Sequence, residues 1–264
     1  MLYITCKMKL FKTFLSEFTY FIRSLIDNIP EWIATFCLGL CAIIIAITIE
    51  PNLRFVNYSN FNLRYPYKGE TLPIPVVGII IIILPCFVLG ILCLIYPRKM
   101  ELALALMSFS QAMCLCLLIA EALKVTVSRP RPNYYDYCGY NTELKKCTNN
   151  SKFKKDAKMS FPSGHSANAF CAGTWMFLFL NEFLQKRSEL WFLLLRMIPI
   201  FIAIFVSITR IIDNMHHVSD VVAGALLGIG TGTIFFTNQH QRIFMHKKKR
   251  EDGLDGLLIT EDEI

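Results

Sequence analysis

The sequence has few charged residues, and long stretches of it have none. Charged residues make up 18% of the 264 residues, whereas hydrophobic residues make up 54% and the mean hydropathy is +0.45. A soluble domain rarely reaches such hydrophobicity, and apolar runs of about 20 residues are typical of transmembrane helices. The composition therefore excludes an ordinary soluble enzyme and favours a single integral membrane domain.

Three further features are missing. No cysteines and histidines have the spacing of a zinc site, and no paired acidic residues lie near the polar clusters described below to hold a metal. No nucleic-acid motif accompanies the net charge of +7, so we attribute the basic residues to lipid headgroups. No signal peptide is expected, because Lys7, Lys9 and Lys12 interrupt the start before an apolar core forms. We therefore expect no cofactor and no nucleic-acid partner.

Six apolar segments are long enough to cross a bilayer. We expect an all-α integral membrane fold with six transmembrane helices in one bundle, which occupies residues 32–240. The expected spans are Trp32–Ile49, Thr71–Pro97, Leu102–Ala120, Phe161–Asn181, Leu190–Thr209 and Val221–Gln239.

The two ends of the chain differ in composition. Residues 1–31 carry apolar side chains at helical spacing from Phe11 to Ile29, which predicts an amphipathic helix on the cytosolic membrane surface; packing against a partner helix is the alternative. Residues 241–264 form a cytosolic tail that is first basic, at Lys247–Arg250, and then acidic. The acidic part, Glu251–Ile264, is short of apolar residues, so we expect it to be disordered.

With six spans, both termini lie on the same side of the membrane. The 27 Lys and Arg residues divide almost evenly between the two sides and give no orientation. Glycosylation sequons at Asn57 and Asn149 both fall on the side away from the termini. Cys138 and Cys147 share a polar loop on that side, where an oxidising compartment would allow a disulfide. We therefore expect cytosolic termini in the endoplasmic reticulum, Golgi or plasma membrane, without a choice among the three.

Three polar clusters stand at the ends of the apolar segments. Ionisable side chains near a bilayer are costly, so they mark candidate functional sites. Counting the membrane crossings brings all three clusters to the same face, where they can converge although they lie far apart in the sequence. The clusters contain Lys124 and Arg131; Ser163, Gly164 and His165; and Arg210, His216 and Asp220.

The clusters suit the binding and transfer of a phosphoryl group. Arginine and lysine bind phosphate oxygens, and a helix that opens at Ser163 and Gly164 presents free N–H groups to an anion. Asp220 lies four residues after His216, where a carboxylate can fix the tautomer of the imidazole. The two histidines predict a double displacement, in which His216 attacks phosphorus and His165 protonates the leaving alkoxide and then activates water.

Other polar and small residues have simpler explanations. We interpret Arg129 as an interface anchor and His217 as a solvated interface histidine. Gly224, Gly228 and Gly232 are four residues apart and form a face for close helix packing. We expect that face to serve the internal bundle rather than a dimer, although a homo-oligomer stays open.

In their order and spacing, the clusters resemble the signature of the type 2 phosphatidic acid phosphatase (lipid phosphate phosphatase) superfamily. Its motifs are Lys, six residues, Arg-Pro; Pro-Ser-Gly-His; and Ser-Arg, five residues, His, three residues, Asp. Thr209 departs from the third motif but keeps a hydroxyl, and Ser128 stands where many relatives have glycine. The run from Ser128 to Tyr135, followed by Cys138 and Cys147, looks closer to the branch of diacylglycerol pyrophosphate phosphatases.

The resemblance implies a metal-independent membrane phosphohydrolase. It would hydrolyse phosphatidate-type phosphomonoesters through a phosphohistidine, with its site on the lumenal or extracellular face; the sequence does not name the preferred lipid. One alternative is a catalytically silent relative that acts as a membrane interaction protein, although every motif histidine and cation is present. A channel or transporter is another, but transport sites usually lie near the midplane of the membrane rather than at one face.

Overall fold

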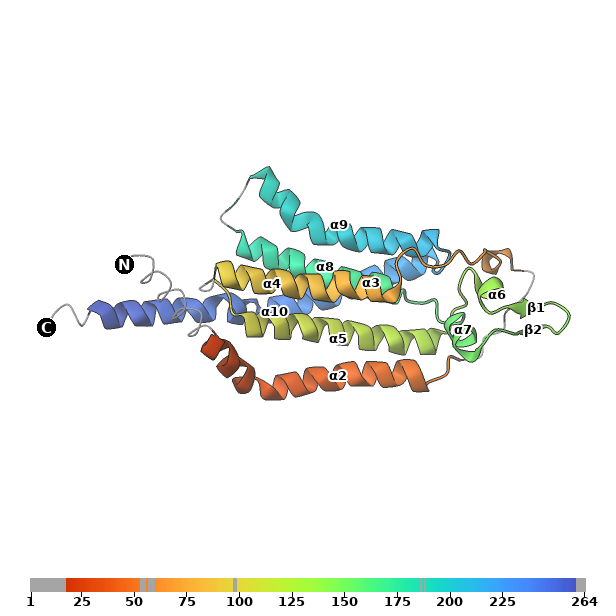
Figure 1. The fold of residues 1–264 in the computed structure, drawn as a ribbon, viewed down its shortest axis with the longest axis horizontal. Helices are drawn as coiled ribbons and strands as arrows, with labels where there is room; N and C mark the ends of the chain where they lie inside the picture. Colours follow the sequence, from red (N-terminus) through yellow and green to blue (C-terminus); the bar gives the residue numbers. More distant parts are fainter. Residues whose placement is uncertain are drawn as a thin grey trace, which may run out of the picture.

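A computed structural model describes residues 18–52, 56, 60–96, 99–185, 187 and 189–259, with residues 245–259 described by their backbone alone. The long helices lie side by side in one bundle, and the short elements between Val127 and Gly164 gather at one end of it (Figure 1). In chain order the elements are α2 (Ile29–Thr48), η1 (Phe61–Leu63), α3 (Ile74–Gly78), the π-helical η2 (Ile79–Ile83), α4 (Leu84–Ile95), α5 (Leu102–Val127), α6 (Tyr134–Tyr137), β1 (Tyr140–Asn141), β2 (Lys146–Cys147), α7 (Ser151–Asp156), α8 (Gly164–Phe183), α9 (Leu190–Ile212) and α10 (Val218–Ile259).

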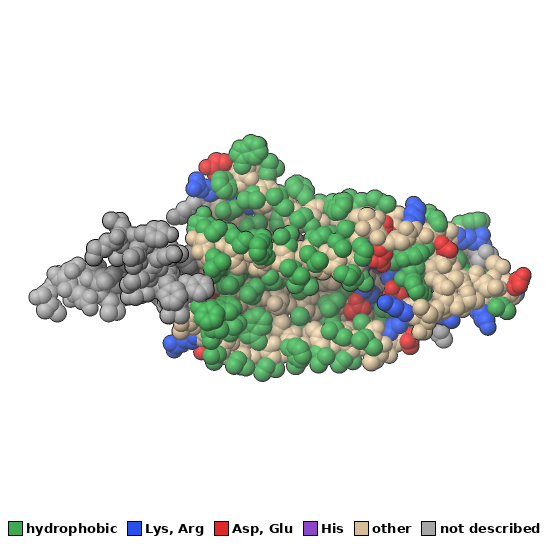
Figure 2. Space-filling model, viewed as in Figure 1, with side chains coloured by type: hydrophobic (Ala, Val, Ile, Leu, Met, Phe, Trp, Pro, Cys, Tyr) green, Lys and Arg blue, Asp and Glu red, His purple; other side chains and the backbone are tan. Residues whose placement is uncertain are grey.

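Five helices among the described residues are long and apolar enough to cross a membrane. They are Ile29–Thr48, the continuous helix Ile74–Ile95, Leu102–Val127, Leu190–Ile212 and Val218–Phe244. These agree with five of the six predicted spans and confirm an all-α membrane protein. Hydrophobic side chains cover the visible length of the bundle, and charged side chains lie mainly towards its ends (Figure 2).

The remaining predicted span, Phe161–Asn181, forms helix α8, which is 20 residues long but is not among the five. Its first turns carry His165, Ser166 and Asn168, which lower its mean hydropathy. Helix α8 packs against α5, α9 and α10, and most of its residues are buried. A helix surrounded by protein can carry polar residues that a lipid-facing helix cannot. The number of six spans therefore stays a prediction.

Helix α5 extends beyond the apolar run Leu102–Ala120, and the added turns carry a residue of the first cluster. The apolar run ends at Ala120, but the helix continues to Val127 and so includes Lys124 in its last turn. Ser128 ends the helix in the left-handed conformation, with φ of 48°, and its N–H donates to the carbonyl of Lys124 at 3.0 Å. Glycine adopts this conformation most easily, which accounts for the glycine that many relatives have there.

The three glycines of α10 pack against α8. A Cβ added at Gly224, Gly228 or Gly232 would lie 2.5, 2.2 or 2.7 Å from a backbone carbonyl oxygen of the facing helix, those of Ser163, Ala167 and Cys171. Such distances leave no room for a side chain. The predicted use of this face within the bundle is confirmed.

The first described residues contact the start of α5. Residues 18–27 are helical, and there the hydroxyls of Tyr20 and Ser24 donate to the carboxylate of Glu101. The rest of the predicted amphipathic helix lies outside the described residues, so its place on the membrane surface stays a prediction. The α10 backbone is helical to Ile259, and the disorder of Glu251–Ile264 stays a prediction. A helix that is already formed extends cheaply through lysine, arginine, glutamate and leucine.

Candidate active site

The structure brings all three predicted clusters to one end of the bundle. Lys124 lies in the last turn of α5, His165 in the first turn of α8, and Arg210 in the last turn of α9. The backbone N–H of Ser163 donates to the carbonyl of Asp220 at 3.0 Å, which joins the starts of α8 and α10. The site is thus assembled from the ends of four helices.

His216 lies in the turn between α9 and α10 with only 4% of its surface exposed. Its Nδ1 lies 2.7 Å from the carbonyl oxygen of Ser160, and its Nε2 lies 3.3 Å from the NH1 group of Arg131. Because a carbonyl oxygen only accepts, Nδ1 carries the proton and Nε2 keeps its lone pair. Burial, and next the positive charge of Arg131, lower the pKa of His216 well below its usual value, so the ring is held neutral.

The sequence predicted that Asp220 orients His216 directly, but the two side chains are not hydrogen-bonded to each other. The nearest approach, from Nδ1 to Oδ2, is 4.0 Å, whereas the hydroxyl of Ser160 donates to Oδ2 at 2.6 Å. The prediction that both residues lie on one face of the first turn of a helix is wrong for His216, because α10 begins at Val218 and the segment that carries Ser160 lies between the two side chains. The buried Asp220 therefore acts on His216 through Ser160.

Two residues that the sequence assigned to the membrane interface also contact Asp220. The NH1 group of Arg129 donates to Oδ1 at 2.6 Å and to the hydroxyl of Ser219 at 2.7 Å. The backbone N–H and Nδ1 of His217 lie 3.0 and 3.1 Å from Oδ2. Both simpler interpretations are wrong, because a fully buried carboxylate needs partners and these residues supply them.

Arg131 is held by the segment between α5 and α8. Its Nε donates to the carbonyl of Asp156 at 2.7 Å, and NH1 donates to the carbonyl of Met215 at 3.1 Å. The hydroxyl of Tyr137 donates to the Asp156 carboxylate at 3.3 Å, and burial, with that carboxylate, raises the pKa of Tyr137. Arg131 therefore reaches His216 from a firmly packed loop.

A disulfide closes this loop next to Tyr137. Cys138 and Cys147 are bonded to each other, and the strands β1 and β2 pair antiparallel between them, with Tyr140 opposite Cys147. The nearby Asn149 is exposed, and its Nδ2 donates to the carbonyl of Tyr137 at 2.9 Å. The sequon at Asn57 lies outside the described residues.

The start of α8 forms the floor of the site. The Oγ of Ser163 accepts the N–H of Ser166 at 3.4 Å, so its own proton remains for a phosphate oxygen. A Cβ at Gly164 would lie 2.8 Å from the Nζ of Lys124, so the lysine passes directly over the glycine. The same Nζ donates to Glu121 at 2.5 Å, the ion pair at the helix end that the spacing allows. His165 has no hydrogen bond to another described residue, which leaves both ring nitrogens for a ligand.

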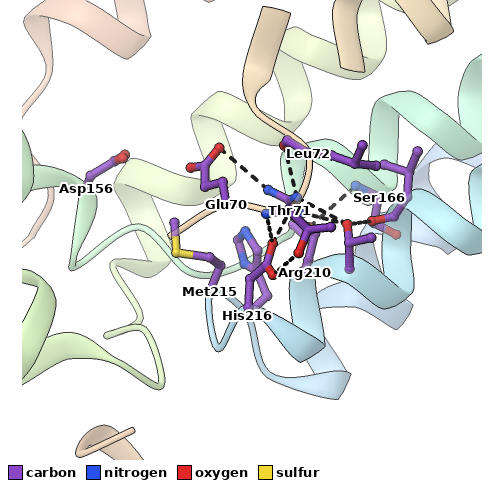
Figure 3. Close-up of polar contacts among 12 residues, drawn as sticks. Glu70, Thr71, Leu72, Asp156, Ser166, Arg210, Met215 and His216 are labelled. Atoms are coloured by element: carbon purple, nitrogen blue, oxygen red, sulfur yellow. Dashed lines mark hydrogen bonds and ion pairs between the residues drawn. The ribbon is translucent and has the colours of Figure 1, made fainter. Parts of the chain in front are cut away.

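Arg210 is fully buried and is held from one side. Its Nε and NH2 donate to Thr209 Oγ1 at 3.2 and 3.1 Å, and NH2 also reaches the Leu72 carbonyl at 3.0 Å and Asp213 at 3.2 Å. Its NH1 has no hydrogen-bond partner within the described part of the chain, and the Glu70 carboxylate lies 3.8 Å away (Figure 3). The hydroxyl of Thr209, which replaces the serine of the third motif, thus accepts hydrogen bonds from Arg210.

Sequence reasoning missed several residues of the site. Ser160, Asp156, Asp213 and Glu70 carry no motif of their own. Asp213 could have been found, because it lies three residues after Arg210 in the same helical turn. The other three are placed by loop packing, for which the sequence contains no signal. In the described ranges, no group of three His, Cys, Asp or Glu residues is arranged to hold a metal ion.

An apolar groove of about 410 Å³ lies along the bundle, between η2, α4, α8 and α9, and no motif residue of the site lines it. Ala169 lines it one turn after His165, and Leu184 lines its far end. At 1.5 Å per residue, the groove follows α8 for about 22 Å, which exceeds the thickness of about 15 Å of one hydrocarbon leaflet. Its walls are almost entirely hydrocarbon.

Comparison with known proteins connects this geometry to a family. The chain is 30% identical over 216 residues to the "Probable lipid phosphate phosphatase 4" of Arabidopsis thaliana, which covers 77% of this chain and 70% of the relative. It is 28% identical to the "Lipid phosphate phosphatase 2" of the same plant, with 79% and 76% covered. The "Probable diacylglycerol pyrophosphate phosphatase 1" of Schizosaccharomyces pombe is 23% identical, with 78% and 79% covered. No solved structure shows significant similarity.

The match to the family includes every residue of the candidate site named by the three motifs. Residues 105–244 match the PAP2 superfamily, and this range holds Lys124, Arg131, His165, His216 and Asp220. The matched residues include helices α8 and α9 in full and most of α5. The chain therefore belongs to the PAP2 superfamily.

Proposed function

We propose that this chain is a metal-independent lipid phosphate phosphatase. It hydrolyses phosphatidate-type phosphomonoesters to the lipid alcohol and inorganic phosphate through a phosphohistidine. The observation that carries the proposal is the buried, neutral imidazole of His216, whose Nδ1–H is held by Ser160 while Nε2 is left with a lone pair beside Arg131. A neutral imidazole among cations is a nucleophile placed beside an anion site.

In the first step, Nε2 of His216 attacks phosphorus. A P–N bond forms, the P–O bond to the lipid breaks, and protonated His165 transfers its proton to the departing alkoxide oxygen. Lys124, Arg131 and Arg210, with the hydroxyl of Ser163 and the N–H of Gly164, stabilise the negative charge on the equatorial oxygens.

In the second step, His165 has become neutral and takes a proton from water. The water oxygen attacks phosphorus, the P–N bond breaks, and Nε2 of His216 regains its lone pair. Inorganic phosphate leaves, and His165 is again protonated for the next lipid. In these two steps all the positive charge that stabilises the phosphate comes from side chains, so no metal ion takes part in the reaction.

The apolar groove supports a lipid as the substrate. A phosphate at His165 would place the attached glycerol near Ala169, where the groove begins. An acyl chain in the groove would remain within the depth of the membrane while the phosphate meets the cations. The groove sets no preference among phosphatidate, lysophosphatidate and diacylglycerol pyrophosphate, because each of them has a phosphate and an acyl chain.

The mechanism is tested with purified protein and phosphatidate. His216→Ala and His165→Ala should each abolish phosphate release, whereas EDTA should leave the wild-type rate unchanged. Rapid quenching with ³²P-labelled lipid should label wild-type protein but not His216→Ala. Label on His216→Ala, or loss of turnover in EDTA, contradicts the mechanism. A folded wild-type protein that releases no phosphate from a broad panel of lipids would favour a silent relative.

The role of the groove is tested by filling it. Ile202→Trp places a large side chain in the groove, and Ile204→Trp places the same side chain on a lipid-facing position of the same helix. Turnover of long-chain phosphatidate should fall at least tenfold in Ile202→Trp only, while a short-chain soluble phosphomonoester should be hydrolysed normally by both. Equal losses with the two substrates would exclude a role of the groove in binding the lipid chain.

We further propose that the site faces the lumen or exterior, with six spans and cytosolic termini. The sequon at Asn149 lies at the same end of the molecule as His216, on an exposed residue. Expressed in a eukaryotic secretory pathway, the protein should carry a glycan that a glycosidase removes and that Asn149→Gln diminishes. Labelling of a cysteine placed at residue 152 by an impermeant reagent applied to the cytosolic side would contradict this orientation.

A further inference from the structure

The guanidinium of Arg210 has a satisfied side and an open side. Nε and NH2 make four hydrogen bonds to groups behind them, whereas the buried NH1 makes none with the described residues. A buried donor of a charged group is expensive to leave unpaired, and a ligand that accepts from it is one explanation for such a donor in a native protein. In a site with several cations, that ligand is an anion.

Glu70 is the acidic residue that faces this open side. Its Oε2 lies 3.8 Å from NH1, which is an ion-pair distance but is too long for a hydrogen bond. The Glu70 side chain is 23% exposed, so it lies at the edge of the site where solvent begins. Figure 3 shows it directed at Arg210, between that residue and Asp156.

The backbone beside Glu70 is fixed, although its side chain is not. The N–H and hydroxyl of Thr71 both donate to Asp213, at 2.8 and 2.5 Å, and the Leu72 carbonyl accepts from Arg210. These contacts hold the loop before α3 over the end of α9. The carboxylate of Glu70 is therefore kept near NH1 by the loop rather than by a hydrogen bond of its own.

We propose that Glu70 weakens the binding of phosphate anions to Arg210. A phosphate oxygen bonded to NH1 would lie close to the Glu70 carboxylate, and like charges at such a distance repel each other. Glu70 must turn towards solvent when a phosphate binds, and it returns as inorganic phosphate leaves. The residue thus lowers product inhibition at the site, an inference that rests on the proposed function.

A structural role for Glu70 makes the opposite prediction. If its carboxylate mainly held Arg210 in place, Glu70→Gln would loosen the guanidinium and weaken phosphate binding. If it repels phosphate, the same isosteric change strengthens binding. The sign of the change in affinity therefore separates the two roles.

The test measures binding rather than turnover. Isothermal calorimetry with inorganic phosphate is performed on the full-length protein in detergent, for wild type, Glu70→Gln and Glu50→Gln. Glu50 is the matched control, because its side chain is 78% exposed and lies 4.0 Å from Lys155 at the same end of the molecule. Glu50→Gln changes the net charge by the same amount as Glu70→Gln, but it does not remove a negative charge beside Arg210.

We expect phosphate to bind Glu70→Gln about tenfold more tightly than wild type, and Glu50→Gln to stay within about twofold. Equal or weaker binding to Glu70→Gln overturns the proposal, as does an absence of phosphate binding to both proteins. Tighter binding in a protein that hydrolyses no lipid would uphold the role of Glu70 and reject the proposed phosphatase activity, so the two failures are distinguishable. An unchanged thermal unfolding midpoint shows that the variant is folded.

Discussion

The Nδ1 atom of His216 donates its hydrogen bond to the backbone carbonyl of Ser160, at 2.7 Å. The hydroxyl of the same serine donates to Asp220 at 2.6 Å. One residue thus fixes the ring of the proposed nucleophile with its backbone and is itself held by a buried carboxylate. A substitution that removes the Ser160 hydroxyl keeps the carbonyl that accepts from His216, but it removes the hydrogen bond by which Asp220 holds this residue.

Ser160→Ala should therefore lower kcat about tenfold and change KM less than twofold. The variant still binds phosphate, but the imidazole is no longer held in line with it. Initial rates with phosphatidate in mixed micelles measure both constants. Ser207→Ala is the control, because it removes another buried hydroxyl contact, with Ser166 at 3.0 Å, away from His216.

The path of contacts from Asp220 through Ser160 to His216 also predicts the combined effect of two substitutions on kcat. Asp220→Asn and Ser160→Ala should each reduce kcat, and the double variant should be little worse than Asp220→Asn alone, because both act through one contact. If the loss of kcat in the double variant equals the product of the two separate losses, Asp220 acts on His216 by another route.

The pH profile of kcat should depend on Arg131. Its charge helps to lower the pKa of His216, and protonation of the nucleophile stops the reaction as the pH falls. Arg131→Gln removes that charge, so protonation becomes easier and the acid limb should move to higher pH. Arg131→Lys keeps the charge and should leave the limb near its wild-type position. A shift to lower pH in Arg131→Gln would contradict the assignment.

Gly164→Ala should impair catalysis in a protein that folds normally. The new Cβ would meet the Nζ of Lys124 at 2.8 Å, and a lysine head group moves away at little cost to stability. We expect kcat/KM to fall at least tenfold with an unchanged unfolding midpoint. Gly90→Ala, where nothing lies within 4 Å of the new Cβ, should retain wild-type activity.

Gly228→Ala should act on stability instead. Its Cβ would lie 2.2 Å from the carbonyl oxygen of Ala167, a backbone atom that cannot move alone. Overpacking of this kind costs about 1–3 kcal/mol, so the unfolding midpoint in detergent should drop. Gly230→Ala, two residues along the same helix, faces open space and should not lower it. Equal midpoints for the two variants would exclude tight packing at Gly228.

The sequence predicted which clusters converge, but not which hydrogen bonds connect their residues. Counting spans was enough to place Lys124, His165 and His216 at one end, because a helix that crosses the bilayer has fixed ends. The contact from Ser160 to His216 depends on the path of a loop, and no periodicity describes that path. Helix α8 was found by its length, yet its interior position follows from packing against its neighbours.

Misjudged residues share a physical cause. Arg129 was interpreted alone, since the depth of Asp220 cannot be read from one sequence, and a fully buried carboxylate recruits every donor within reach. The apolar run of the third span ends at Ala120 because Glu121 and Lys124 interrupt it, although the spacing of these two residues already allowed an ion pair at the helix end. Their mutual ion pair at 2.5 Å lets the helix continue through both of them.

The contact between α8 and α10 has a consequence for biosynthesis. The N–H of Ser163 is bonded to the carbonyl of Asp220, and Gly224 packs on the carbonyl of Ser163, so the start of α8 is completed by α10, which is translated after α9. Lys124 and His165 are translated before His216 and Asp220. A nascent chain therefore carries no working phosphatase while it is being inserted, and the membrane in which it is made is exposed to the enzyme only after synthesis has passed α10.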